Sequence, residues 1–228
     1  MEYMNILEQI KGKLIVSCQA LENEPLHGAD IMRKMAKAAK EGGASAIRAN
    51  GILDIKAIKS ETNLPVIGLV KRDYNGCEVY ITPTVKEIQE LIESGCEIIA
   101  MDATNRCHPD QISLKEKVDL IHQAGLIAMA DISTDEEALY AQSLGFDVIS
   151  TTLSGYTPYS LQQEAPDVEL VGRLVKTLSI PVIAEGRITT TEDIKAIKAQ
   201  NPFAIVVGSA ITRPQIITKR FLDAYLKD

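Results

Sequence analysis

The stretch "SIPVIAEGRI", residues 179–188, begins as a buried strand and ends in charged residues. Pro181 opens it, residues 182–184 are continuously apolar, and Glu185 and Arg187 follow at once. A strand that is apolar at every position is typical of a parallel sheet covered on both faces. Parallel α/β proteins gather functional groups at the carboxyl ends of their strands. The stretch therefore predicts a buried strand whose charged carboxyl end belongs to a functional site.

A second stretch, "NLPVIGLVKR" at residues 63–72, repeats the polar-x-Pro-Val-Ile pattern about half the chain away. When the two stretches are aligned, Leu69 matches Glu185 and Lys71 matches Arg187. In each stretch the two residues lie two positions apart, so they have the same parity along the strand. Side chains of one parity point to the same face, so both strands would aim side chains at a shared central space. The repeat favours a closed barrel in which these strands lie opposite each other.

Short apolar runs alternate with amphipathic segments along the whole chain, as strands and helices of a parallel α/β protein do. Eight units of this kind in 228 residues predict a single (β/α)₈ TIM barrel domain over residues 1–228. An open, doubly wound sheet is the alternative. The expected strands are residues 14–20, 46–49, 65–70, 97–103, 126–132, 147–153, 181–186 and 203–208.

Capping residues agree with the expected helices. The expected N-caps are Thr84, Ser113, Ser133 and Thr190 or Thr191. The last segment, "ITKRFLDAYLKD", predicts an amphipathic helix whose apolar stripe completes the outer ring of the barrel.

Composition narrows the functional classes. A formal net charge of −7 and a pI near 5.1 argue against nucleic-acid binding, which normally requires a basic surface. No apolar run reaches the roughly 18 residues of a membrane helix, and the first residues lack the apolar core of a signal peptide. The four cysteines show no CxxC pairing and the three histidines no ligand spacing, so we expect a cytoplasmic protein with reduced thiols and without a metal centre.

Polar residues end nearly every expected strand. In strand order they are Gln19, Arg48, Lys71 with Arg72, Asp102, Asp131, the segment "TTLSGYT" and Glu185. Each could instead cap a helix or form an ion pair, as Asp102 and Asp131 could with Arg48 and Arg72. Their common position predicts a catalytic face.

A phosphate site is expected beside this face. In "VVGSAITRP", residues 206–214, Gly208, Ser209 and Ala210 can bring backbone N–H groups close to an anion at a helix start. Gly186 follows the seventh strand, and barrels of this class often bind phosphate between the loops after strands seven and eight. Arg213 could add a bidentate contact.

Motifs along nearly the whole chain resemble the N-acylglucosamine-6-phosphate 2-epimerase family, that is, N-acetylmannosamine-6-phosphate epimerases. They are "LIVSCQALENEPLHG", "AIRANG", "VIGLVKRDY", "YITPT", "MDAT", "MADIST", "STTLSGYT", "VIAEGRI" and "VVGSAITRPQIITKRF". The resemblance implies a ribulose-phosphate-binding type of barrel. It also implies interconversion of N-acetylmannosamine 6-phosphate and N-acetylglucosamine 6-phosphate in sialic acid catabolism, without a metal or an organic cofactor.

The same resemblance assigns residues motif by motif. Lys71 in "VKRDY" is similar to the catalytic lysine and Glu185 in "AEGR" to the catalytic carboxylate. The remaining matches are sugar or phosphate contacts: Gln19, Arg48, Asp131, Gly186, Arg187, Gly208, Ser209 and Arg213. Family members often have a second glycine where Ser209 stands, and serine keeps the backbone N–H. The expected ligand is a small N-acyl amino-sugar phosphate; the oligomeric state stays open, with a homodimer as one option.

Epimerisation at C2 makes chemical sense of a lysine and a carboxylate. The C2 proton becomes more acidic in the open-chain aldehyde, and an amine can remove it only while neutral. Since the reference pKa of lysine is near 10.4, burial and the nearby Arg48, Arg72 or Arg187 would have to lower the pKa of Lys71. A Schiff-base lyase and a noncatalytic sugar-phosphate sensor remain the alternatives.

Overall fold

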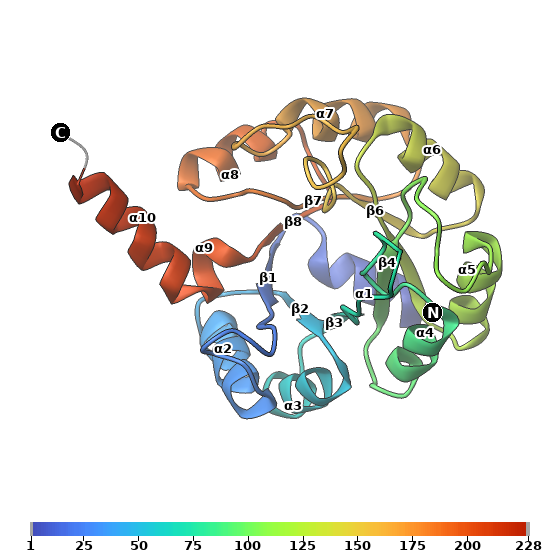
Figure 1. Ribbon diagram of the computed structural model, residues 1–228, viewed down its shortest axis with the longest axis horizontal. Helices are drawn as coiled ribbons and strands as arrows, with labels where there is room; N and C mark the ends of the chain where they lie inside the picture. The colour runs from blue at the N-terminus through green and yellow to red at the C-terminus, as the bar shows by residue number, and fades with distance from the viewer. Residues whose placement is uncertain (1, 227–228) are drawn as a thin grey trace.

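The structure, a computed structural model, describes residues 2–226, with side chains from residue 6 onward. Its parallel strands pair in chain order, and the last strand pairs with the first, so the sheet closes into a barrel (Figure 1). The predicted (β/α)₈ TIM barrel is confirmed, and the open-sheet alternative is wrong. Residues 1, 227 and 228, which the expected domain included, lie outside the described residues.

The bounds of the elements are as follows. The strands are β1 (Leu14–Cys18), β2 (Ala46–Asn50), β3 (Val66–Leu69), β4 (Ile98–Asp102), β5 (Ile127–Asp131), β6 (Val148–Ser150), β7 (Val182–Ala184) and β8 (Ala204–Val207). The helices are α1 (Glu2–Ile10), α2 (Ala29–Glu41), α3 (Ile52–Thr62), α4 (Val85–Ile92), α5 (Leu114–Gln123), α6 (Asp135–Ser143), α7 (Val168–Thr177), α8 (Thr191–Lys198), α9 (Ser209–Thr212) and α10 (Pro214–Leu226).

Capping boxes start several of the outer helices. The hydroxyls of Thr84, Ser113 and Thr190 accept backbone N–H groups of α4, α5 and α8, as the sequence predicted. The prediction for Ser133 is wrong by one residue, because Thr134 is the N-cap of α6. The side chain of Ser133 binds the helix instead, donating to Glu137 over 2.8 Å.

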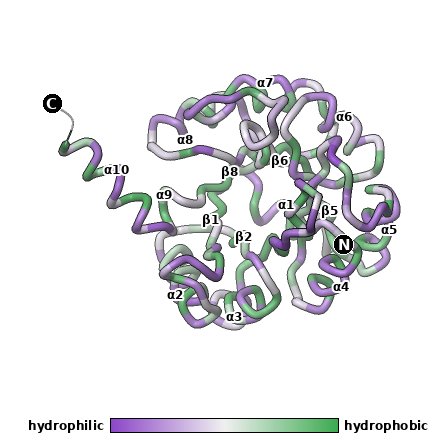
Figure 2. Tube along the Cα trace, viewed as in Figure 1, coloured by the Kyte–Doolittle hydropathy of each residue, from purple (hydrophilic) through white to green (hydrophobic). Residues whose placement is uncertain are grey.

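The core has two layers. Inside the barrel, side chains such as Ile67, Met129 and Ile183 form one buried cluster, and Ile10 at the end of α1 joins it. A larger cluster lies between the strands and the surrounding helices. Figure 2 shows the hydrophobic strands at the centre and hydrophilic residues along the outer helices. The interior is therefore a packed core, and only the carboxyl ends of the strands are left for a site.

A segment that we call the inserted segment, residues 79–82, lies between the ends of β3 and β4. These two strands pair over only two residue positions before they separate. Ile81 forms an antiparallel bridge with Lys71, and the amide of Asp102 donates to its carbonyl over 3.0 Å. Thr82 has a φ of 47°, a backbone conformation that is rare for a β-branched residue.

The last helix does not complete the outer ring, so that prediction is wrong. Figure 1 shows α10 leaving the barrel at its left, because Arg213 is not helical and turns the chain between α9 and α10. Large apolar side chains of α10 are exposed, with Phe221 at 73% and Tyr225 at 85%. The amphipathic pattern correctly indicated an apolar stripe on this helix. It did not indicate whether the stripe packs on the barrel or on another surface. Within residues 2–226, none of the helices combines the length and the apolar character needed to span a bilayer.

Candidate active site

A cavity of about 770 Å³ opens at the carboxyl ends of the strands. It brings together residues from β1, β2, β3, β7, β8 and the loops that follow them. Of the residues expected from the sequence, those that line it are Gln19, Arg48, Lys71, Glu185, Gly186, Arg187, Gly208, Ser209 and Arg213. Leu69 also lines it, so the parity prediction for the two repeated stretches is confirmed: both strands aim side chains at one central space.

Asp131 is the exception, because it lies behind Arg48 and not at the cavity surface. Both side chains are buried, and their fork-to-fork ion pair has Nη1–Oδ1 and Nη2–Oδ2 distances of 3.0 and 2.5 Å. Nη1 of Arg48 also donates to Oε2 of Glu185 over 2.8 Å. A charged bidentate pair of this kind fixes the guanidinium plane, so Asp131 holds Arg48 in place and Arg48 faces Glu185.

Thr152 completes this network. Its hydroxyl lies 2.8 Å from Oδ1 of Asp131 and 3.0 Å from Oε2 of Glu185. Burial raises the pKa of the Glu185 carboxyl, although the Arg48 guanidinium beside it opposes the shift. Glu185 is therefore a carboxyl group suited to exchanging a proton with a ligand hydroxyl.

Lys71 lies across the cavity from Glu185, directly after β3. Its amide donates to Oδ1 of Asn50 over 2.8 Å, which fixes the backbone. Within residues 6–226 its side chain has no hydrogen bond or ion pair. Burial, followed by the positive charges of Arg48 and Arg213, lowers the pKa of the Lys71 amine. This is the tuning that a lysine needs to act as a base.

The sequence named Arg72 and Arg187 as further causes of this shift, and the structure does not support either. Arg72 points away from the cavity and forms ion pairs with Glu87 and Glu90 on α4. Arg187 lies on the opposite wall, where it donates to the carbonyl of Gln163. The cations that lower the pKa of Lys71 are Arg48, as expected, and Arg213. The sequence had assigned Arg213 only to phosphate binding.

The loops after β7 and β8 form the other end of the cavity. Gly186 has a φ of 111°, which a side chain would strain. Gly208 lies so close to β1 that a Cβ atom there would be 3.3 Å from Cβ of Ser17. Arg213 lies nearby, with its guanidinium held by Glu24 at 2.8 Å and by the Ser209 hydroxyl at 3.3 Å. Backbone amides and a guanidinium thus converge, as an anion site requires.

Arg187 is held in place from several sides. Its guanidinium lies over the ring of Tyr156, 6.0 Å from the centroid. A Cβ atom on Gly155 would lie 1.9 Å from its Nη1 atom, so a side chain at residue 155 would displace the guanidinium. Of the two tyrosines in this loop, Tyr156 lines the cavity, while Tyr159 donates to Glu137.

Gln19 presents an unused acceptor. Its Nε2 group donates to the hydroxyl of Ser17 over 2.9 Å, and its buried Oε1 atom has no hydrogen-bond partner within residues 6–226. Because a buried polar atom without a partner is costly, Oε1 is suited to accepting a ligand hydroxyl. Within the same residues, no cluster of three or more His, Cys, Asp or Glu side chains could hold a metal ion.

Thr152 and Tyr80 are among the cavity residues that the sequence did not single out. Thr152 belongs to the segment "TTLSGYT", which was expected at the end of the sixth strand without a role for any one residue. Tyr80 belongs to "YITPT", and no periodicity places it at a strand end. It reaches the cavity only because the inserted segment folds back between β3 and β4.

The chain is similar to known proteins in sequence and in structure. The family model described as "Putative N-acetylmannosamine-6-phosphate epimerase" matches residues 32–227. A relative from Clostridium perfringens named "Putative N-acetylmannosamine-6-phosphate 2-epimerase" is 58% identical over 218 residues, which are 96% of this chain and 99% of the relative. A relative of the same name from Clostridioides difficile is 57% identical over 219 residues, 96% of this chain and 98% of the relative.

Solved structures agree with these sequence relatives. The N-acetylmannosamine-6-phosphate 2-epimerase from Clostridium perfringens superposes with a TM-score of 0.94 at 57% identity, over 96% of this chain and 95% of that chain. A thiamine phosphate pyrophosphorylase from Pyrococcus furiosus, at 15% identity and a TM-score of 0.62, covers 98% of this chain and 100% of its own, and shares the fold alone.

Proposed function

The chain belongs to the N-acetylmannosamine-6-phosphate epimerase family, and we propose that Lys71 and Glu185 carry the proton transfers of its reaction. It is a carbohydrate-phosphate 2-epimerase that interconverts N-acetylmannosamine 6-phosphate and N-acetylglucosamine 6-phosphate in sialic acid catabolism. The observation that supports the two catalytic residues is their position: a partly buried amine with a lowered pKa and a partly buried carboxyl with a raised pKa line one cavity.

Ring opening comes first in the proposed mechanism. Glu185 accepts the proton of the C1 hydroxyl and passes it to the ring oxygen as the bond between C1 and the ring oxygen breaks, which produces the open-chain aldehyde. The raised pKa of Glu185 suits it to receiving and returning this proton near neutral pH. Arg48 keeps the carboxyl oriented through its 2.8 Å contact.

Inversion at C2 follows. The neutral amine of Lys71 removes the C2 proton, and the electron pair moves into an enolate whose negative charge develops on the aldehyde oxygen. The guanidinium of Arg48, fixed by Asp131, stabilises that charge, an effect typically worth a few kcal/mol. After rotation about the C2–C3 bond, which stays single in the enolate, the Lys71 ammonium returns the proton to the other face of C2. Every step uses side chains of this chain, without a cofactor.

The phosphate of the substrate lies at the opposite end of the cavity. We assign it to the backbone N–H groups of Gly208 and Ser209, to the loop at Gly186, and to Arg213. Arg187 and the free Oε1 acceptor of Gln19 would contact sugar hydroxyls along the cavity walls. The ligand therefore spans from the phosphate loops to Lys71.

Proton NMR of N-acetylmannosamine 6-phosphate in D₂O tests this proposal. We expect the wild type to form N-acetylglucosamine 6-phosphate with deuterium at C2, and Lys71→Ala to do neither while still binding inorganic phosphate. Full exchange by Lys71→Ala would remove the lysine from the mechanism. Trapping of a covalent adduct by borohydride with substrate would instead favour a Schiff base at Lys71.

We also propose that the protein is a cytoplasmic homodimer in which a second copy of this chain covers the apolar face of α10. The exposed Phe221, Leu222 and Tyr225 support this, because a protruding helix with such side chains needs a partner surface. Four free cysteines support a reducing compartment. Light scattering should give the mass of a dimer for the wild type and of a monomer for a variant with serine at these three positions; a monomeric wild type would contradict the proposal.

A further inference from the structure

Tyr80 is a cavity residue to which the mechanism gives no role. It is the second residue of the inserted segment, next to Ile81, which bridges to Lys71. The amide of Arg72 donates to the carbonyl of Tyr80 over 3.0 Å. Tyr80 is thus attached on both sides to the chain that carries the lysine, and its position relative to Lys71 is fixed.

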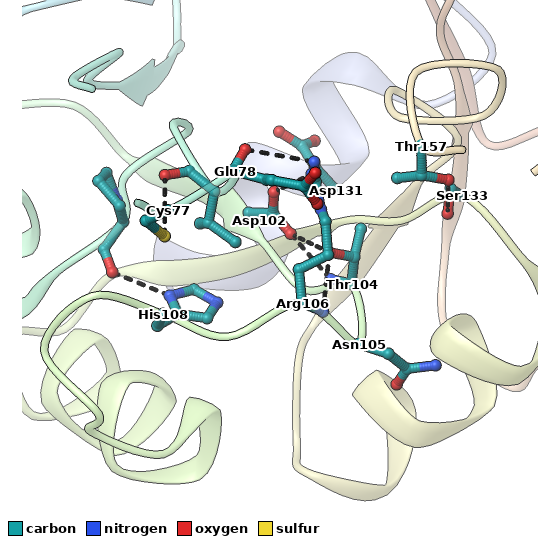
Figure 3. A network of polar contacts seen from close by, with 12 residues as sticks. Cys77, Glu78, Asp102, Thr104, Asn105, Arg106, His108, Asp131, Ser133 and Thr157 are labelled. Atoms are coloured by element: carbon teal, nitrogen blue, oxygen red, sulfur yellow. Dashed lines mark hydrogen bonds and ion pairs between the residues drawn. The ribbon is translucent and has the colours of Figure 1, made fainter. Parts of the chain in front are cut away.

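A polar network holds Glu78, the residue directly before the inserted segment, from the other side (Figure 3). The guanidinium of Arg106 lies between two acceptors: it donates to Oδ2 of Asp102 over 2.6 Å and to the carbonyl of Glu78 over 3.2 Å. Asp102 is fully buried and also accepts from the hydroxyl of Thr104. Asp102 at the end of β4 therefore has a structural role, holding the segment that presents Tyr80.

The side chain of Tyr80 carries a free hydroxyl into the cavity. It packs against the interior core cluster and lines the cavity together with Leu69 and Ile81. Within residues 6–226, its hydroxyl makes no hydrogen bond. Burial, and then the negative charge of Asp131, raises the pKa of the phenol, so it stays a neutral O–H donor.

The position of Tyr80 selects the part of the substrate that it meets. The phosphate loops follow β7 and β8, whereas Tyr80 lies between β3 and β4, on the other side of the barrel. Lys71 must touch C2, and C2 bears the N-acyl group. Besides Lys71, the cavity residues that come from β3 and the inserted segment are Leu69, Tyr80 and Ile81, two apolar side chains and one phenol. An acyl group, with one carbonyl acceptor and an alkyl end, matches these three side chains.

We propose that Tyr80 binds the N-acyl group of the substrate and sets which acyl groups are accepted. The hydroxyl donates to the acyl carbonyl oxygen, and the ring, with Leu69 and Ile81, limits the space for the alkyl end. This inference rests on the proposed function, because the placement of the acyl group follows from Lys71 acting at C2.

The test compares kcat/KM for mannosamine 6-phosphates that carry N-acetyl, N-propanoyl or N-butanoyl groups. Tyr80→Phe keeps the ring but loses the donor, so we expect kcat/KM to fall about 2- to 12-fold for all three substrates. Tyr80→Leu also shortens the side chain, so the ratio of N-butanoyl to N-acetyl kcat/KM should rise about 10-fold or more. Tyr156→Phe makes the same chemical change in the loop after β6 and should leave the acyl ratio at the wild-type value.

The outcomes separate this inference from the proposed function. A wild type that fails to epimerise the N-acetyl substrate would refute the proposed function. The acyl assignment alone would be overturned by a different result. In that result the wild type is active, Tyr80→Phe has the wild-type kcat/KM, and Tyr80→Leu has the wild-type ratio of N-butanoyl to N-acetyl kcat/KM. Competitive inhibition by inorganic phosphate, which binds across the cavity, should be unchanged in both variants and shows that they are folded. If Tyr80→Leu fails this control, Tyr80→Phe alone decides.

Discussion

Replacement of Lys71 by methionine should change activity and stability in opposite directions. The two side chains have similar length, so the cavity keeps its shape while the amine is lost. A general base contributes about 10²- to 10⁴-fold to the rate, which corresponds to about 2.7–5.4 kcal/mol of barrier. We therefore expect Lys71→Met to lower C2 proton exchange by at least about 100-fold.

The stability change follows from the surroundings of the amine. Lys71 has no side-chain partner within residues 6–226, and its charge is disfavoured by burial, Arg48 and Arg213. Removing an unpaired, partly buried charge should stabilise the fold by about 0.5–2 kcal/mol. For a protein of this size, about 2–4 °C of melting temperature corresponds to 1 kcal/mol, so Lys71→Met should melt about 1–8 °C higher at pH 7.

The pH dependence of this gain has a defined sign. The pKa of Lys71 is lower in the folded state than in the unfolded state, so folding is opposed while the amine is charged. That cost is fully present below the folded-state pKa and disappears as the pH rises towards the unfolded value near 10.4. Differential scanning calorimetry between pH 6 and pH 10 should show the two melting temperatures converging. A variant that melts below the wild type at pH 7, or exchanges C2 within tenfold of it, would refute the reasoning.

Other substitutions test the remaining contacts. Arg213→Gln removes a cation that lowers the pKa of Lys71, so the pKa of Lys71 should rise and the increase of kcat with pH should move to higher pH. An unchanged pH profile of kcat would show that Arg213 does not influence the Lys71 amine. Arg48→Met leaves the buried Asp131 and the partly buried Glu185 without their cation. It should cost about 3–5 kcal/mol, seen as a loss of melting temperature; a loss below 1 kcal/mol would contradict the network. Gly155→Ala places a Cβ atom on the Arg187 guanidinium and adds strain at a φ of +79°, so KM should rise several-fold; a normal KM would show that Arg187 is not needed there.

Local order along the chain was predictable from the sequence alone. Continuously apolar strands indicated a parallel sheet, and the parity shared by residues 69, 71, 185 and 187 indicated one interior space, because side chains alternate strictly along a strand. Capping boxes placed several helix starts to within a residue, since the cap depends on residues only three apart.

Contacts between distant segments were not predictable in this way. The sequence offered Arg48 and Arg72 alike as ion-pair partners for Asp131, and only the fold selects Arg48, 83 positions away. The choice of Arg213 over Arg72 as a neighbour of Lys71 likewise depends on how whole loops fold. Tyr80 enters the cavity only because residues 79–82 insert between two separating strands. The sequence determines which residues can form a strand, a cap or a charge pair through short-range periodicity and chemistry. The tertiary structure alone decides which of the possible partners meet, because burial and Coulomb interactions depend on distance in space and not on distance along the chain.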